Sequence, residues 1–213
     1  MAARLQAMGQ IRYQNGFAVT LHDDLINEPR RWSSPRLVFV NSMSDLFHEN
    51  VPRIFIEKVF ITMCECPQHI FQILTKRSQR LHELADDLPW PNNVWIGVSV
   101  EDARVMSRIH DLVQVPAAVR FLSCEPLIGP MDHLPLADIH WVIVGGESGP
   151  GARPMRAEWV HSILQQCRKH NIPFFFKQWG GVWKKRTGRE LNGRIYDELP
   201  RKQKPGSDSN DQR

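Results

Sequence analysis

The fold of this chain is decided by the stretch VWIGVSVEDARVMSRIHDLVQVPAAVRFLSCEP (residues 94–126). It begins with an apolar run of strand length, continues with apolar residues at helical spacing, and ends with a second apolar run. A continuous rather than alternating run is typical of a strand that is buried on both faces, as in a parallel sheet covered by helices. The stretch therefore predicts a strand–helix–strand unit with parallel strands.

The same order recurs along the chain, with helical patterns over residues 51–63, 78–88, 102–113 and 157–171. Residues 1–16 have the pattern of the back half of an amphipathic helix followed by a loop, and no strand precedes that helix. We therefore expect an α/β fold: a partial TIM-barrel-like (βα) repeat of about seven mainly parallel strands, with the first barrel strand missing. The predicted strands are FAVTL (17–21), RLVFVN (36–41), IFQILTKR (70–77), VWIGVSVED (94–102), VRFLSCEP (119–126), WVIVGGESG (141–149) and PFFFKQW (173–179).

Three segments are expected along the chain. Residues 1–183 form the barrel-like domain, and residues 184–200 form a small C-terminal hairpin around Asn192-Gly193, a favoured turn dipeptide. Residues 201–213 contain no apolar anchor, so a disordered tail is expected there.

Composition bounds the function classes. The 213 residues contain no apolar run near the roughly 20 residues of a membrane span, and the N-terminus has no signal-peptide pattern, so we expect a cytoplasmic protein without a membrane partner. From residue 184 onward there are nine Lys or Arg and five Asp or Glu, which leaves 18 of each sign before it. The basic segment from residue 184 onward could bind nucleic acid through phosphate contacts, although a solvated extension is the commoner explanation.

The glycine-rich segment GGESGPGARPM (145–155) follows a strong predicted strand and precedes a predicted helix. Glycines let a backbone approach a ligand and point several N–H groups at an anion. A small-molecule cofactor could lie there, with an arginine as counter-charge; the alternative is a turn that needs positive φ angles. The cofactor-binding candidates are Gly145, Gly146, Glu147, Ser148, Gly149 and Arg153.

Charged residues at the ends of predicted strands are the catalytic candidates, because parallel strands bring their C-terminal ends to one rim. For Asp45 and Glu101, helix capping or a place in the first helical turn is an alternative explanation. We predict no metal site, since Asp45 and His48 lack a third ligand and Cys64 and Cys66 form a weak metal motif. The candidates are Asp45, Glu101, Glu125, Lys76 and Lys177.

Strand geometry gives a sharper expectation for three of these rim residues. Glu125, Glu147 and Lys177 should lie within about 5–10 Å of one another, with the lysine between the two carboxylates. Such a group could hold the amino-acid end of a ligand like S-adenosylmethionine, or it could be an ion-pair cluster that only orders the rim. We expect Gly146→Val to abolish ligand binding and to leave the fold largely intact.

Six motifs in order carry a resemblance to a known family: NSMSDLFHENVP, FQILTKR, VWIGVSVED, RFLSCEPL, WVIVGGESGPGARPM and PFFFKQWGG. Over about residues 1–200 the chain resembles an uncharacterised phage-protein family found in bacteria, prophages and mobile elements. Its full-length members carry an N-terminal three-cysteine motif like that of radical S-adenosylmethionine (SAM) enzymes. The resemblance therefore implies a barrel, SAM and a [4Fe–4S] cluster for those full-length relatives, with no substrate fixed.

This chain begins at MAARLQAMG, which matches the helix after that cysteine loop, and none of its four cysteines supplies the motif's spacing. It is expected to be a fragment, a misplaced start or a degenerate copy that holds no cofactor of its own. The implied function is the cluster-less part of a radical-SAM-like enzyme that modifies a nucleic acid or nucleotide, inactive as this chain alone. The alternative is a non-catalytic nucleic-acid-binding or interaction module of phage or mobile-element origin.

Overall fold

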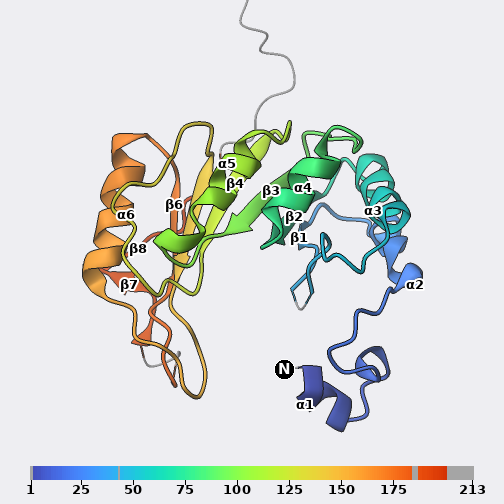
Figure 1. Ribbon diagram of the computed structural model, residues 1–213, viewed down its shortest axis with the longest axis horizontal. Coiled ribbons are helices and arrows are strands. Elements are labelled where there is room, and N and C mark those ends of the chain that lie inside the picture. Colours follow the sequence, from blue (N-terminus) through green and yellow to red (C-terminus); the bar gives the residue numbers. More distant parts are fainter. Residues whose placement is uncertain (1, 43, 184–186, 201–213) are drawn as a thin grey trace, which may run out of the picture.

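The computed structural model of the chain describes residues 2–42, 44–183 and 187–200. Its centre is a six-stranded sheet in which every neighbouring pair is parallel and the spatial order follows the sequence. The sheet curls into a half-barrel (Figure 1), so the expected α/β partial barrel is confirmed. The strands are β1 (Leu37–Phe39), β2 (Ile70–Thr75), β3 (Val94–Ser99), β4 (Val119–Cys124), β5 (Trp141–Gly145) and β6 (Phe174–Gln178).

Helices connect β1 to β2, β2 to β3, β3 to β4 and β5 to β6 and cover the outer side of the half-barrel (Figure 1), whereas residues 125–140 between β4 and β5 are irregular. The four main ones are α3 (Arg53–Glu65), α4 (Ser78–Ala85), α5 (Ser107–Val113) and α6 (Ala157–Lys169). The shorter ones are α1 (Ala2–Ala7), η1 (Ile11–Tyr13), α2 (Asp23–Ile26), η2 (Glu28–Arg31) and η3 (Ala103–Val105). Among the described residues, every helix is too short or too polar to cross a lipid bilayer.

The predicted first strand, FAVTL at residues 17–21, is wrong. These residues form turns and irregular backbone, and the Phe17 side chain is largely exposed. A strand is stable only where a neighbour pairs with its backbone groups, and within the described ranges β1 pairs with β2 alone. The half-barrel therefore contains six strands where the sequence predicts seven, and residues 17–21 belong to the irregular segment that leads to β1.

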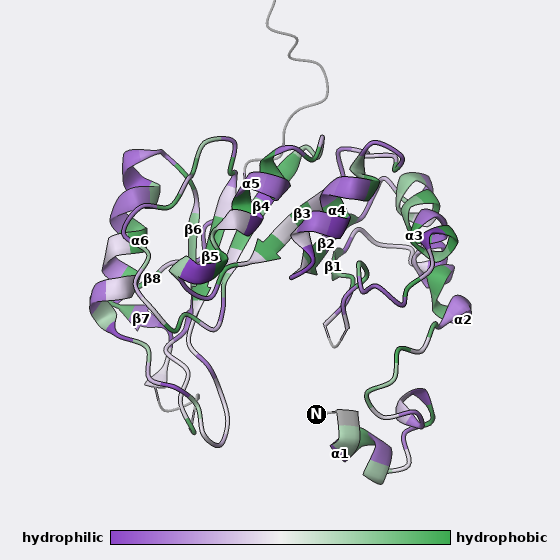
Figure 2. Ribbon diagram, viewed as in Figure 1, coloured by the Kyte–Doolittle hydropathy of each residue, from purple (hydrophilic) through white to green (hydrophobic). Residues whose placement is uncertain are grey.

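The two faces of the sheet differ in what they pack against. The outer face contributes large apolar side chains such as Phe71, Ile96 and Phe176 to one core shared with the helices. The helices turn polar residues outward over this core (Figure 2). The concave face has a separate cluster around Trp95, Phe121 and Trp141. This division explains the continuous apolar runs, because successive residues of one strand are buried on opposite faces.

The C-terminal hairpin is confirmed. Strand β7 (Glu190–Leu191) pairs antiparallel with β8 (Arg194–Ile195), and the turn residues Asn192 and Gly193 both have positive φ, as a tight hairpin turn requires. The segment after β8 covers the outer edge of β6, since the Phe176 N–H donates to the Tyr196 carbonyl (2.9 Å). The division at residue 183 stays a prediction, and residues 201–213, the predicted disordered tail, lie outside the described part.

We predict that Gly97→Ala destabilises the fold. A Cβ at Gly97 would lie closer than 3.0 Å to the Phe121 ring, and that ring also packs on Trp141, with centroids 5.7 Å apart. Overpacking of this kind costs about 1–3 kcal/mol, measurable as a lower free energy of unfolding in urea. Phe121→Leu should recover part of the loss in the double variant. An unchanged stability of Gly97→Ala would contradict this description of the concave face.

Candidate functional site

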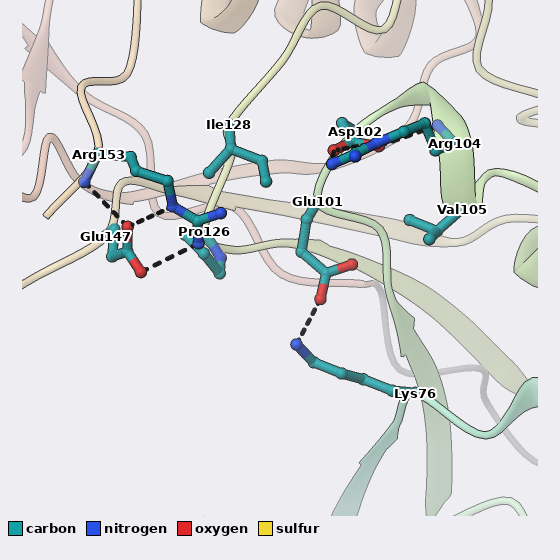
Figure 3. A pocket seen from close by; sticks show the side chains of 9 residues that line it. All are labelled: Lys76, Glu101, Asp102, Arg104, Val105, Pro126, Ile128, Glu147 and Arg153. Carbon is teal, nitrogen blue, oxygen red and sulfur yellow. Dashed lines mark hydrogen bonds and ion pairs between the residues drawn. The ribbon is translucent and has the colours of Figure 1, made fainter.

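The C-terminal ends of four strands surround a cavity of about 490 Å³ (Figure 3). Its lining residues follow β2, β3, β4 and β5, so segments far apart in sequence meet at one rim. Four sequence-predicted candidates line it together: Lys76, Glu101, Glu147 and Arg153. The remaining lining residues are Asp102, Arg104, Val105, Pro126 and Ile128.

Glu101, just after β3, is held by two cations. Lys76 pairs with one carboxylate oxygen, and Arg108 Nη1 donates to the other at 2.9 Å. Arg108 also donates to the Ser99 carbonyl (2.8 Å), which fixes the end of the strand. Burial alone raises the pKa of Glu101, but Lys76 and Arg108 outweigh it, so the pKa lies below its ordinary value. Glu101 is therefore an ionised hydrogen-bond acceptor at neutral pH.

Glu147 and Arg153 close the glycine-rich loop on itself. Arg153 donates from Nε (2.7 Å) and Nη2 (3.0 Å) to the two carboxylate oxygens of Glu147, and its backbone N–H adds a third bond (2.9 Å). These bonds to Arg153 hold the pKa of Glu147 at about 2. Arg153, expected as a counter-charge for a ligand, thus neutralises a carboxylate of its own loop.

Glu125 and Lys177 meet as expected, but the lysine does not lie between two carboxylates. Lys177 Nζ pairs with Glu125 Oε2 at 2.9 Å, and Gln178 Nε2 donates to Glu125 Oε1 at 2.9 Å. Gln178 also donates to the Gly146 carbonyl (3.2 Å). Glu147 is turned to Arg153 instead, because a bidentate arginine within its own loop is the stronger partner. The group joins β4 and β6 beside the cavity.

The loop glycines are needed for close backbone packing. A Cβ at Gly146 would lie closer than 3.0 Å to the carbonyl oxygen of Trp179, so the expectation that Gly146→Val leaves the fold intact is wrong. Ser148 forms a bridge with Gly181, and Gly149 takes a positive φ. The loop is therefore held against the segment that follows β6. Ligand contact by Gly145 and its neighbours stays a prediction.

Asp45 is a structural clamp. It accepts hydrogen bonds from Thr75 Oγ1 (2.7 Å) and the Lys76 N–H (3.0 Å), from Arg77 Nη1 (3.1 Å), and from the Phe47 N–H (3.0 Å). Four donors occupy its acceptor positions and tie the loop after β1 to the end of β2. Asp45 lies beside a second, larger cavity of about 950 Å³, which shares Lys76 with the first.

Two charged residues of the site, Arg108 and Asp102, are not among the candidates predicted from the sequence. Arg108 lies on α5 and reaches back to Glu101, and no spacing signal in the sequence indicates this contact. Asp102 accepts from Arg104 Nη2 at 2.6 Å, and this bond lowers the pKa of Asp102. Within residues 2–42, 44–183 and 187–200, no three His, Cys, Asp or Glu side chains are grouped to hold a metal ion.

We predict that the Glu147 carboxyl titrates with a midpoint of about 2 and that Arg153→Met moves the midpoint up toward 4.5, its ordinary value. A lowered folded-state pKa stabilises the fold fully above the unfolded pKa, and this contribution is lost as pH falls. The stability difference between wild type and Glu147→Gln should therefore close between about pH 5 and pH 2. Carboxyl NMR titration measures the midpoint, with Arg53→Met on the outer surface as control; a wild-type midpoint near 4.5 would contradict the clamp.

Comparison with known proteins identifies the family. Residues 1–200 match a family described as a protein of unknown function (DUF5131). No curated protein and no solved structure matches the chain. Because the match spans the half-barrel, the rim and the hairpin, the chain belongs to the DUF5131 family.

Proposed function

We propose that this chain is the ligand-binding half-barrel of a radical-SAM-like enzyme and that its rim cavity binds S-adenosylmethionine. One observation carries the proposal: paired charges of both signs, from the ends of four parallel strands, surround a cavity of about 490 Å³. Ligand pockets for small molecules commonly measure about 300–1,000 Å³. In parallel βα folds this rim is the usual place for ligands.

The chemistry of the lining residues fits SAM. The ligand carries an amino group, a carboxylate and a sulfonium, together with a ribose and an apolar adenine face. Glu101 and Glu147 can accept from the amino group, and Lys76 can donate to the carboxylate or the ribose. Val105, Pro126 and Ile128 supply apolar surface for the base. When bound, SAM would supply the reactive sulfonium carbon, and the residues of this chain would orient it.

The cysteines of this chain do not fit an iron–sulfur cluster. Such a cluster is held by a group of cysteine thiolates, and the part of the chain that the structure describes has no group of three His, Cys, Asp or Glu side chains that could hold a metal. Cys66, Cys124 and Cys167 are buried in the core, and Cys64 is half-buried. Burial raises the pKa of Cys167 to about 12 and raises the pKa of Cys124 as well. In the proposed enzyme, the cluster ligands are therefore not these cysteines.

We place a second substrate, a nucleotide or nucleic acid, in the larger cavity of about 950 Å³. Phe17, Trp32 and Phe39 line it and could stack on bases. Lys76 and Arg77 also line this cavity and could meet phosphates. Phage origin and a cytoplasmic location stay predictions from the sequence.

Isothermal titration of this chain with SAM tests the proposal. We expect saturable binding to the wild type and at least about tenfold weaker binding to Glu101→Gln, because a hydrogen bond to a charged group contributes about 1.5–3 kcal/mol. The matched control is Glu83→Gln, an exposed glutamate on α4, which should bind SAM like the wild type. Circular dichroism checks that each variant is folded.

The absence of SAM binding by the folded wild type, or equal affinities of wild type and Glu101→Gln, would contradict the proposal. Salt-dependent binding of an oligonucleotide without any SAM binding would favour the alternative, a non-catalytic nucleic-acid-binding module.

A further inference from the structure

Arg189 places a guanidinium on the concave face of the half-barrel. Its guanidinium carbon lies 5.1 Å from the centroid of the Phe175 ring, a cation–π contact. Phe175 belongs to the concave-face cluster, and its ring centroid lies 5.9 Å from that of Trp141. The aromatic floor of the half-barrel therefore carries a positive charge that the hairpin segment supplies.

Two nitrogens of this guanidinium, Nε and Nη2, are buried, and neither meets a hydrogen-bond acceptor among the described residues. Burying a charged donor without a partner is costly, so such groups are normally paired. Nε–H and Nη2–H point in parallel from one edge of the guanidinium plane. Their spacing matches two oxygens of a carboxylate or a phosphate.

Two other arginines of this chain show what that edge binds. Arg153 uses Nε (2.7 Å) and Nη2 (3.0 Å) to hold the two oxygens of Glu147. Arg104 uses Nε (3.1 Å) and Nη2 (2.6 Å) on the carboxylate of Asp102. In both cases the partner is an oxyanion close in sequence. The carboxylate of Glu190, next to Arg189, makes no such contact in the described structure.

We propose that Arg189 binds an oxyanion, a carboxylate or phosphate group of a ligand, on the concave face. The Phe175 ring holds the guanidinium plane, and its Nε/Nη2 edge forms two parallel hydrogen bonds to the oxyanion. The site is formed by β6 and the residue before β7, and it does not depend on what binds in the rim cavity. It gives the concave face specificity for ligands with an acidic group.

The test uses inorganic phosphate and acetate as probes on the whole chain at constant ionic strength. In the wild type, phosphate should raise the melting temperature and shift the Arg189 Nε–H resonance in a saturable manner. Arg189→Met should melt at a higher temperature than the wild type without phosphate, because an unpaired buried charge is removed. Phosphate should no longer raise the melting temperature of that variant. Arg189→Lys, which lacks the parallel donors, should bind phosphate at least about tenfold more weakly.

Arg194→Met is the matched control. Arg194 also stacks on an aromatic ring, with its guanidinium carbon 5.0 Å from the Tyr196 centroid, but it is exposed on β8. Its loss should leave the phosphate response unchanged.

Two results would overturn the proposal. One is a melting-temperature response to phosphate, and to acetate, that is the same in Arg189→Met as in the wild type. The other is a lower melting temperature of Arg189→Met without phosphate, which would show that the chain itself already stabilises the Arg189 guanidinium. Neither result depends on SAM binding, so this proposal and the proposed function fail separately.

Discussion

Parallel pairing of the six strands is the constraint on which the rest of the structure depends. It requires a long crossover connection between successive strands. Four of the five crossovers contain a helix, and these helices cover the outer face, whereas the crossover from β4 to β5 is irregular. It also brings all strand ends of one kind to one rim. The register Ser99↔Ser123 between β3 and β4 sets Glu101 and Glu125 at similar heights. Residues separated by more than 70 positions, such as Lys76 and Glu147, thereby line a common cavity.

A rim that carries many charges is stable only where each charge meets a partner, because desolvating an unpaired charge is costly. Each carboxylate at the cavity has its own cation: Glu101 has Lys76 and Arg108, Asp102 has Arg104, and Glu147 has Arg153. This pairing orders the side chains before any ligand arrives. The charged groups of a ligand with charges of both signs can then replace one member of each pair. Because the side chains are already ordered, binding loses less side-chain entropy, and this favours affinity.

Much of the fold could be predicted because the apolar runs in the sequence coincide with the strands of the sheet. The runs from Arg36 onward are continuous and apolar, and each became a strand of the half-barrel. The run at residues 17–21 has the same composition but no pairing partner in the described structure, and composition alone cannot reveal that. Lys76, Glu101, Glu147 and Arg153 converge because they follow strands, which the sequence order encodes.

The partners of these residues were beyond the sequence, because long-range contacts decide them. Arg108 approaches Glu101 from a helix, and the close contact of Gly146 with Trp179 joins two loops. Three of the four donors to Asp45, which stays a predicted catalytic candidate, come from residues 75–77 at the end of β2, far from Asp45 in sequence.

The most direct test of the central claim is a crystal structure of this chain grown with saturating SAM. If the rim binds SAM, ligand density is expected in the rim cavity, between the Lys76–Glu101 pair and the Glu147–Arg153 pair. Density for SAM at any other place, or an unchanged rim without ligand density at saturating SAM, would contradict that claim.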